Sequence, residues 1–227
     1  MNPWNTLKRT ISKIRRQGIV RTFRASTSHL YNIYFDKKYQ LDTVAGKSRE
    51  KFLKEHNFTT DYGHYQGANT LLVKKLLKRL NLDKNQTFID LGSGKGRILL
   101  LANAYGFSAV KGIELSKELC DISEKNTTAF FAKSKLKSKI SILNIDATTY
   151  KFDKTDGVLF MYNPFNGTLF EKVVKNLKQS LVKHPRNLTI IYINPTETKM
   201  LESHFNFSSI ERCTWNEDYN IYTINSV

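Results

Sequence analysis

Short apolar runs alternate with longer amphipathic segments from residue 68 to the C-terminus. In residues 68–80, leucines recur at intervals of three and four with lysines and an arginine between them, which predicts an amphipathic helix. Residues 87–91 form a short, mostly apolar run, as expected for a strand covered by helices on both faces. The alternation then predicts helices over 97–105, 116–131, 168–181 and 197–204, and strands over 109–114, 140–144, 157–162, 188–193, 208–215 and 220–225.

Strands that alternate with helices build a parallel sheet with helices on both of its faces. The last two predicted strands are joined by Asn216, Glu217 and Asp218 in a hairpin-like connection, so one strand should run opposite to the others. The expected fold class is therefore α/β, Rossmann-like, with a mostly parallel seven-stranded sheet and an antiparallel strand in the C-terminal hairpin.

The N-terminal part of the chain differs from this pattern, because residues 1–35 carry Lys and Arg but no Asp or Glu. We expect a basic extension over residues 1–60 and the main domain over 61–227. The residues that predict an amphipathic helix in the extension are Trp4, Leu7, Ile11 and Ile14. The apolar face of this helix could pack on the domain or dock on an acidic membrane surface. Alternatively, the basic extension could bind an acidic partner such as nucleic acid.

Composition limits the class of protein. The chain has 227 residues, 40% of them hydrophobic, and a formal net charge of +16, which fits one globular core with a strongly basic surface. Cys120 and Cys213 are far apart and have no Cys or His cluster beside them, so neither a disulfide framework nor a metal site is expected. We expect a cytoplasmic protein, with peripheral attachment to a membrane surface as the alternative.

The strand at 87–91 leads into the segment Asp90-Leu91-Gly92-Ser93-Gly94-Lys95-Gly96. Glycine lets the backbone turn tightly and approach a ligand, and the following helix offers free amide groups, so the segment predicts a nucleoside-binding loop. A dinucleotide fingerprint needs glycine at the sixth position, where Arg97 stands. A phosphate-binding P-loop needs Ser or Thr where Gly96 follows Lys95. NAD and ATP are both disfavoured.

The order Asp-Leu-Gly-Ser-Gly-Lys-Gly resembles the first motif of the class I S-adenosylmethionine-dependent methyltransferases. The resemblance implies S-adenosyl-L-methionine as the cofactor. It also implies that Asp90 orients the loop and the cofactor's ammonium group. The residues that would wrap the methionyl part are Gly92, Ser93, Gly94 and Gly96.

Two further acids stand at the ends of successive predicted strands. Glu114 ends the second strand, where its two oxygens could accept hydrogen bonds from both ribose hydroxyls. Asp146 follows the third strand, and the resemblance implies that it accepts a hydrogen bond from the adenine amino group, with Ile145 or Ala147 beside the ring. A turn-forming aspartate is the alternative for Asp146.

The fourth predicted strand ends in Tyr162-Asn163-Pro164-Phe165, which resembles the Asn-Pro-Pro-Phe motif of amino-group methyltransferases but has one proline. The resemblance implies that Asn163 and the carbonyl of Pro164 accept hydrogen bonds from the target nitrogen. Phe165 would pack beside that nitrogen and Tyr162 would assist. The single proline leaves an oxygen acceptor open, and a strand-ending turn is the structural alternative.

Together these motifs resemble a bacterial group of class I methyltransferases distantly similar to the non-SET histone-lysine methyltransferases, over residues 61–227. The resemblance implies methyl transfer by direct displacement to an amino nitrogen of a protein side chain or small molecule. The alternatives are a nucleic-acid methyltransferase that uses the basic extension, and a non-catalytic cofactor-binding module tethered by it. The lid candidates are Tyr62, His64 and Tyr65.

Overall fold

The computed structural model describes residues 18–44, 68–134 and 139–226 of the chain. Two sets of predicted residues lie outside this described part. They are the apolar face of the N-terminal helix, Trp4, Leu7, Ile11 and Ile14, and the lid candidates Tyr62, His64 and Tyr65.

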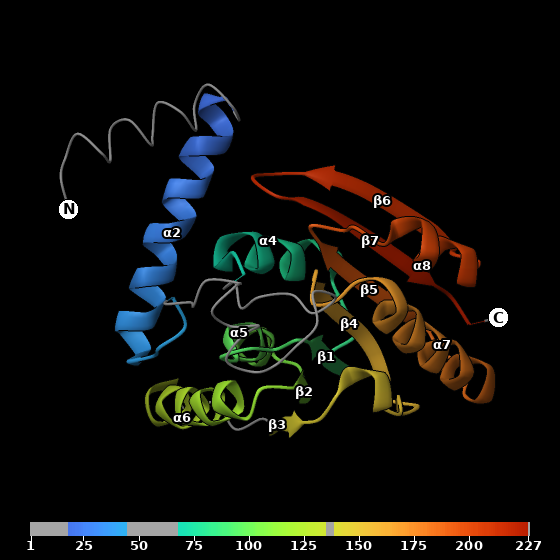
Figure 1. Cartoon of the computed structure of the whole chain (residues 1–227). Coiled ribbons are helices and arrows are strands. Elements are labelled where there is room, and N and C mark those ends of the chain that lie inside the picture. Colours follow the sequence, from blue (N-terminus) through green and yellow to red (C-terminus); the bar gives the residue numbers. More distant parts are fainter. Residues whose placement is uncertain (1–17, 45–67, 135–138, 227) are drawn as a thin grey trace.

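One sheet runs through the domain, with strands in the order β3-β2-β1-β4-β5-β7-β6 (Figure 1). Neighbouring strands from β3 to β5 pair in parallel, whereas β7 is antiparallel to both β5 and β6. The expected α/β class, the seven strands and the C-terminal hairpin are confirmed. The strands are β1 (Thr87–Leu91), β2 (Ala109–Glu114), β3 (Lys139–Asn144), β4 (Asp156–Tyr162), β5 (Leu188–Ile193), β6 (Ser209–Thr214) and β7 (Asp218–Ile224).

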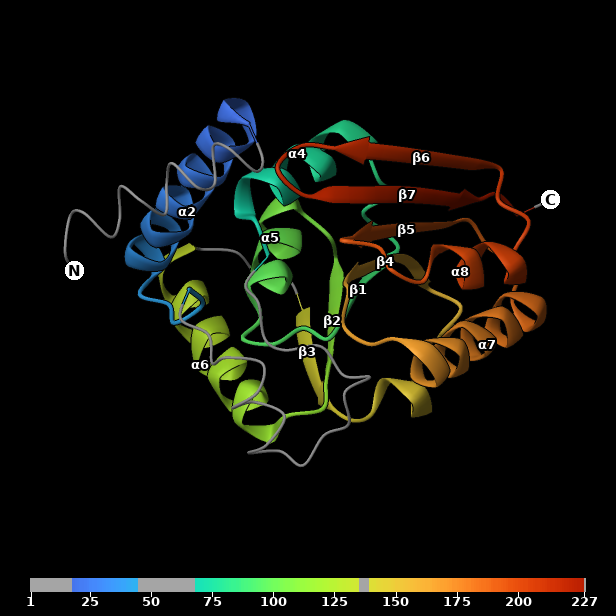
Figure 2. The same ribbon diagram turned by 45° about the horizontal axis from the view of Figure 1, so that its top comes forward.

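Helices cover both faces of the sheet (Figure 2). On one face, α4 and α5 pack their leucines against Phe88 and Phe160, and α6 adds Phe130. On the other face, α7 and α8 pack against Ile89 and Tyr192. The helices are α2 (Ile19–Tyr39), α4 (Thr70–Leu80), α5 (Arg97–Tyr105), α6 (Lys117–Ser134), η1 (Ala147–Thr149, a 3-10 turn), α7 (Gly167–Lys183) and α8 (Thr198–His204).

Burial on both faces explains the apolar runs of the central strands. All five residues of β1 are buried, and its apolar side chains are divided between the two clusters, with Phe88 on the α5 side and Ile89 and Leu91 on the α7 side. Side chains of a strand point alternately to opposite faces, so a central strand needs apolar residues at consecutive positions. The buried β1 strand ends at the carboxyl edge of the sheet, and the glycine loop begins there.

Helix α2 is attached to the start of α5 by buried polar contacts. The Asp36 carboxylate accepts hydrogen bonds from the backbone amides of Thr43 and Val44, at 2.7 and 2.8 Å. The Arg97 guanidinium donates to the Thr43 hydroxyl at 2.7 Å and to the Ala68 carbonyl at 3.0 Å. Residues 19–44 thus contact the same core as the sheet, while the domain boundary near residue 60 stays a prediction. None of the helices in the described part is long and apolar enough to cross a membrane.

Candidate cofactor and acceptor site

The glycine loop turns sharply from β1 into α5. Gly92, Gly94 and Gly96 have φ angles of 76°, 53° and 83°, in the left-handed region that side chains with a Cβ rarely adopt. The amides of Gly92 and Ser93 both donate to the carbonyl of Ile113 on β2, at 2.9 and 3.1 Å. The loop is thereby held against the end of the neighbouring strand. The buried Ser93 hydroxyl oxygen has no hydrogen-bond partner among the described residues.

Glu114 organises this loop through both of its carboxylate oxygens. Its Oε2 accepts from the amide of Gly94 and its Oε1 from the amide of Ser116, both at 2.8 Å. The side chain is buried, and burial raises its pKa against the opposing effect of these amide donors. Each carboxylate oxygen can accept more than one hydrogen bond, so the ribose role predicted for Glu114 is compatible with these contacts.

Asp90 is a second buried acid beside Glu114. Its residue is 3% exposed, and it receives no hydrogen bond from the described residues. Burial raises the pKa of its carboxyl group well above the ordinary value, and the charge of Glu114 adds to the effect. Two buried acids placed together favour a positively charged ligand. This arrangement matches the ammonium-orienting role predicted for Asp90.

Replacing Asp90 with asparagine is expected to stabilise the ligand-free protein at about pH 8, because the variant has no buried charge. A carboxyl group whose pKa is raised by folding stabilises the folded state most below its unfolded pKa. That stabilisation is lost as pH rises through the folded value. The melting-temperature advantage of Asp90→Asn should therefore shrink toward about pH 4. Scanning calorimetry at several pH values checks this, and a variant less stable than wild type at every pH contradicts it.

The Asn-Pro turn after β4 packs directly on the glycine loop. A Cβ atom added at Gly92 would lie 2.7 Å from the Pro164 Cβ, so the two segments can approach this closely only with glycine at position 92. Asn163 itself has a φ angle of 41°. Since β1 and β4 are parallel neighbours, their carboxyl ends meet at one edge. The structure thus brings the predicted cofactor loop and the predicted acceptor motif together.

The Asn163 side chain is held by residues that follow β5. Its Oδ1 accepts from the Thr196 hydroxyl at 2.8 Å and from the Tyr192 hydroxyl at 3.4 Å. These contacts fix the orientation of the amide before any acceptor binds. Phe165 is buried and lies 6.2 Å from Phe170 of α7, centroid to centroid. Its ring thus packs in the α7-side cluster, and its place beside the target nitrogen stays a prediction.

The Tyr162 hydroxyl belongs to a polar network that sequence reasoning missed. It donates to Glu217 Oε1 at 2.9 Å and accepts from Asn194 Nδ2 at 3.1 Å. Burial raises the pKa of Glu217, and its Oε2 is buried without a hydrogen-bond partner in the described part of the chain. One signal was available in the sequence. Asn194-Pro195 repeats Asn163-Pro164 at the end of the adjacent strand, and Asn194 also has a positive φ, 48°.

Asp146 and Ala147 lie after β3, at the same edge of the sheet. Asp146 Oδ1 accepts from both the amide and the hydroxyl of Thr148, at 2.8 Å, and so caps the short η1 turn. The backbone amide of Ile145 donates to the Glu114 carbonyl at 3.1 Å, which ties this turn to β2. Asp146 therefore has the turn-forming contacts of the alternative interpretation, and its adenine role stays a prediction. Within the described residues, no group of His, Cys, Asp and Glu could hold a metal ion.

The chain is similar to known proteins in sequence and in fold. The family model described as "Histone methylation protein DOT1" matches residues 44–179. A curated histone-lysine N-methyltransferase, H3 lysine-79 specific, from Gibberella zeae is 29% identical over 108 residues, which cover 48% of this chain and 21% of that protein. The protein of the same description from Emericella nidulans is 27% identical over 131 residues, covering 56% and 25%. The chain thus spans a quarter or less of the length of these relatives.

Solved structures share the fold at low sequence identity. TrmN from Thermus thermophilus superposes with a TM-score of 0.52 at 14% identity, covering 70% of this chain and 49% of that one. The ribosomal protein L11 methylase from Lactobacillus delbrueckii subsp. bulgaricus gives 0.50 at 15% identity, covering 72% and 81%. At such low sequence identities, these structural similarities support a shared fold and nothing more.

Proposed function

Because this chain belongs to the DOT1 family of histone methylation proteins, within the class I S-adenosylmethionine-dependent methyltransferases, we propose that it methylates an amino nitrogen of a protein side chain or small molecule. The observation that carries this proposal is the packing of the Asn163-Pro164 turn on the glycine loop at Gly92. It puts hydrogen-bond acceptors for a target nitrogen next to the loop assigned to the cofactor. Lysine is the acceptor residue in the names of the two curated relatives.

The residues of the loop fit S-adenosylmethionine on three counts. The buried Asp90 carboxylate suits the cofactor's ammonium group, and its raised pKa would return toward normal once a cation is bound. The buried Ser93 hydroxyl has unused hydrogen-bonding capacity among the described residues. Glu114 lies one strand further along the same edge, where a ribose diol would meet a carboxylate. When bound, the cofactor would supply an electrophilic methyl group on a sulfonium for direct displacement by the acceptor.

Orientation of the acceptor is the task proposed for Asn163. A nitrogen that donates hydrogen bonds to the Asn163 amide oxygen and to the Pro164 carbonyl points its lone pair away from both acceptors. The Thr196 hydroxyl, 2.8 Å from Asn163 Oδ1, holds that oxygen in place in advance, and the long 3.4 Å contact with Tyr192 leaves it able to accept from a target nitrogen. Holding reactants in attack geometry can contribute about 7 to 11 kcal/mol to lowering a barrier. The site therefore acts chiefly by positioning.

A protonated amine must also lose a proton before or during methyl transfer, and Glu217 is the proposed final acceptor of that proton, through Tyr162. The Tyr162 hydroxyl donates to Glu217 Oε1, so Tyr162 would take the proton released by the amine as it passes its own hydroxyl proton to that carboxylate oxygen. Desolvation brings the pKa of Glu217 above its ordinary value and closer to neutrality, which suits a proton acceptor.

Replacing Glu217 with glutamine is expected to lower kcat about tenfold. This loss is smaller than the roughly 10²- to 10⁴-fold rate acceleration contributed by a base that acts directly on the substrate. In the wild type, kcat should fall as pH drops through the raised pKa of Glu217, because protonation removes the acceptor. The glutamine variant keeps an oxygen that can accept from the Tyr162 hydroxyl, but its kcat should no longer fall in this low-pH range. The matched control is Glu211→Gln, since Glu211 is exposed on β6 and pairs with Arg79. Identical pH profiles for wild type and Glu217→Gln would rule out the role.

Transfer of a labelled methyl group identifies the acceptor class. The purified chain is incubated with methyl-labelled S-adenosylmethionine and with protein, nucleic-acid and small-molecule fractions of a cell extract. We expect label in protein or small amines, recovered as N-methyl product, and its loss in Asn163→Ala. Label in nucleic acid, or as an O-methyl product, would overturn the nitrogen assignment. Binding of S-adenosylhomocysteine without turnover on any fraction would identify a non-catalytic module.

A further inference from the structure

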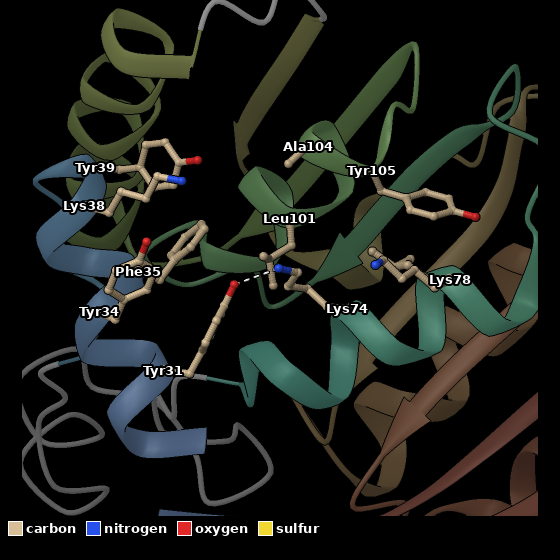
Figure 3. Close-up of a pocket in the computed structure, with 11 residues that line it drawn as sticks. Tyr31, Tyr34, Phe35, Lys38, Tyr39, Lys74, Lys78, Leu101, Ala104 and Tyr105 are labelled. Atoms are coloured by element: carbon tan, nitrogen blue, oxygen red, sulfur yellow. Dashed lines mark hydrogen bonds between the residues drawn. The ribbon is translucent and has the colours of Figure 1, made fainter. Parts of the chain in front are cut away.

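A separate cavity lies between α2, α4 and α5 (Figure 3). Its volume is about 220 Å³. Helix α5 begins at Arg97, directly after the glycine loop, but it lines the cavity with Leu101, Ala104 and Tyr105 from its other end. The cavity therefore belongs to a different part of the surface from the candidate cofactor site. Its volume is below the range of roughly 300 to 1,000 Å³ that holds drug-sized ligands.

Aromatic rings and ammonium groups make up most of the cavity wall. Lys38 and Lys74 each place their Nζ 5.0 Å from the centroid of a tyrosine ring, Tyr39 and Tyr31 respectively. The Lys74 ammonium also donates to the Tyr31 hydroxyl at 2.6 Å, a contact drawn in Figure 3. Tyr34 is 56% exposed. The cavity wall thus combines tyrosine rings with ammonium groups, two of which lie over tyrosine rings.

The described lining of the cavity is positively charged. No Asp or Glu is among the described residues that line it. Asp36 of α2 is buried and accepts from the amides of Thr43 and Val44. Lys84 adds a further cation, with its Nζ 4.6 Å from the centroid of the Tyr105 ring. An anion with an aromatic part is the ligand that complements this wall.

We infer that the cavity binds one nucleotide of a single-stranded nucleic acid. The base enters among the tyrosine rings, where stacking is favourable for any base, and its phosphates meet the exposed ammonium groups of Lys38 and Lys78. A single base suits a cavity of this size better than a larger ligand does. The site would hold a nucleic acid on the enzyme without exposing it to the methyl group, because the cavity lies at the far end of α5 from the glycine loop.

Fluorescence anisotropy of a short labelled oligo(dT) titrated with the 227-residue chain tests the inference. Tyr34→Ala is expected to weaken binding about fivefold or more through loss of stacking. Lys38→Glu combined with Lys78→Glu should weaken it further and flatten the slope of log K against log salt by about 1.4, for two lost phosphate contacts. The charge-matched control is Lys172→Glu with Lys178→Glu, both exposed on α7 on the other face of the sheet.

The aromatic control is Phe23→Ala, since Phe23 is 68% exposed on α2 and does not line the cavity. It should leave the affinity unchanged. Equal losses in the two lysine pairs would mean general attraction to a basic protein and would overturn the inference, as would absence of binding. Binding to anionic lipid vesicles that Phe23→Ala weakens, without oligonucleotide binding, would instead identify α2 as a membrane-docking surface. All of these readouts are independent of methyl transfer.

Discussion

Asn163→Ala is expected to lower kcat for methyl transfer about 100-fold, with the dissociation constant for S-adenosylhomocysteine within about threefold of wild type. Asn163 orients the acceptor in the proposed mechanism, and a small misplacement of reacting atoms is enough for a loss of that size. The cofactor is assigned to the loop at Gly92–Gly96 instead, so its affinity should barely change. Single-turnover kinetics with labelled cofactor, together with calorimetry of S-adenosylhomocysteine binding, separate the two effects.

The backbone of Asn163 requires a control, because its φ of 41° is strained for alanine. Asn163→Gly removes the side chain and the strain together, and it should lose as much activity as Asn163→Ala. Thr196→Val keeps the asparagine but removes one hydroxyl that holds its amide, so a smaller loss is expected. An active glycine variant would assign the effect to the backbone and contradict an orienting amide.

Glu114→Ala is expected to weaken S-adenosylhomocysteine binding about 10- to 150-fold, the equivalent of one charged hydrogen bond worth about 1.5 to 3 kcal/mol. The loss has two sources. The ribose loses its acceptor, and the amides of Gly94 and Ser116 lose the carboxylate that positions the loop. Isothermal titration calorimetry measures the affinity. Glu118→Ala, on the exposed first turn of α6, serves as the matched control.

Unchanged affinity in Glu114→Ala would refute both the ribose contact and the support of the loop. A melting curve distinguishes loss of binding from loss of folding, because Glu114 is buried. Glu114→Gln offers a milder test, since one oxygen remains to accept from an amide while the charge is removed. It should bind more tightly than Glu114→Ala and less tightly than wild type.

The sheet and its helices were predictable because their apolar patterns follow from burial on two faces. The bounds expected for β1, α5, β2 and β5 agree with the structure. Helix α2 was harder to predict, for a physical reason. Thr22, Ser28 and Asn32 are buried, whereas Phe23 and Leu30 are exposed, so the hydrophobic pattern points away from the packed face. Polar contacts and the ring of Phe35 hold this helix instead.

The geometry of the candidate site was predictable where it follows from local sequence and unpredictable where it needs tertiary contacts. The glycine spacing predicted a tight loop after β1, and the strand-end position of Glu114 predicted an acid beside it. The contact between Tyr162 and Glu217 joins residues 55 positions apart, and the hairpin turn gave no sign of it. The contacts of Asn163 with Tyr192 and Thr196 likewise depend on the pairing of β4 with β5. No single segment of sequence contains that information.

A crystal structure with S-adenosylhomocysteine bound tests most directly whether the glycine loop and the Asn-Pro turn form one active site. We expect the amino-acid end of the ligand at Asp90 and the glycine loop, the ribose hydroxyls on Glu114, and the sulfur facing Asn163. A ligand bound at another edge of the sheet, or with its sulfur turned away from Asn163, would contradict this expectation.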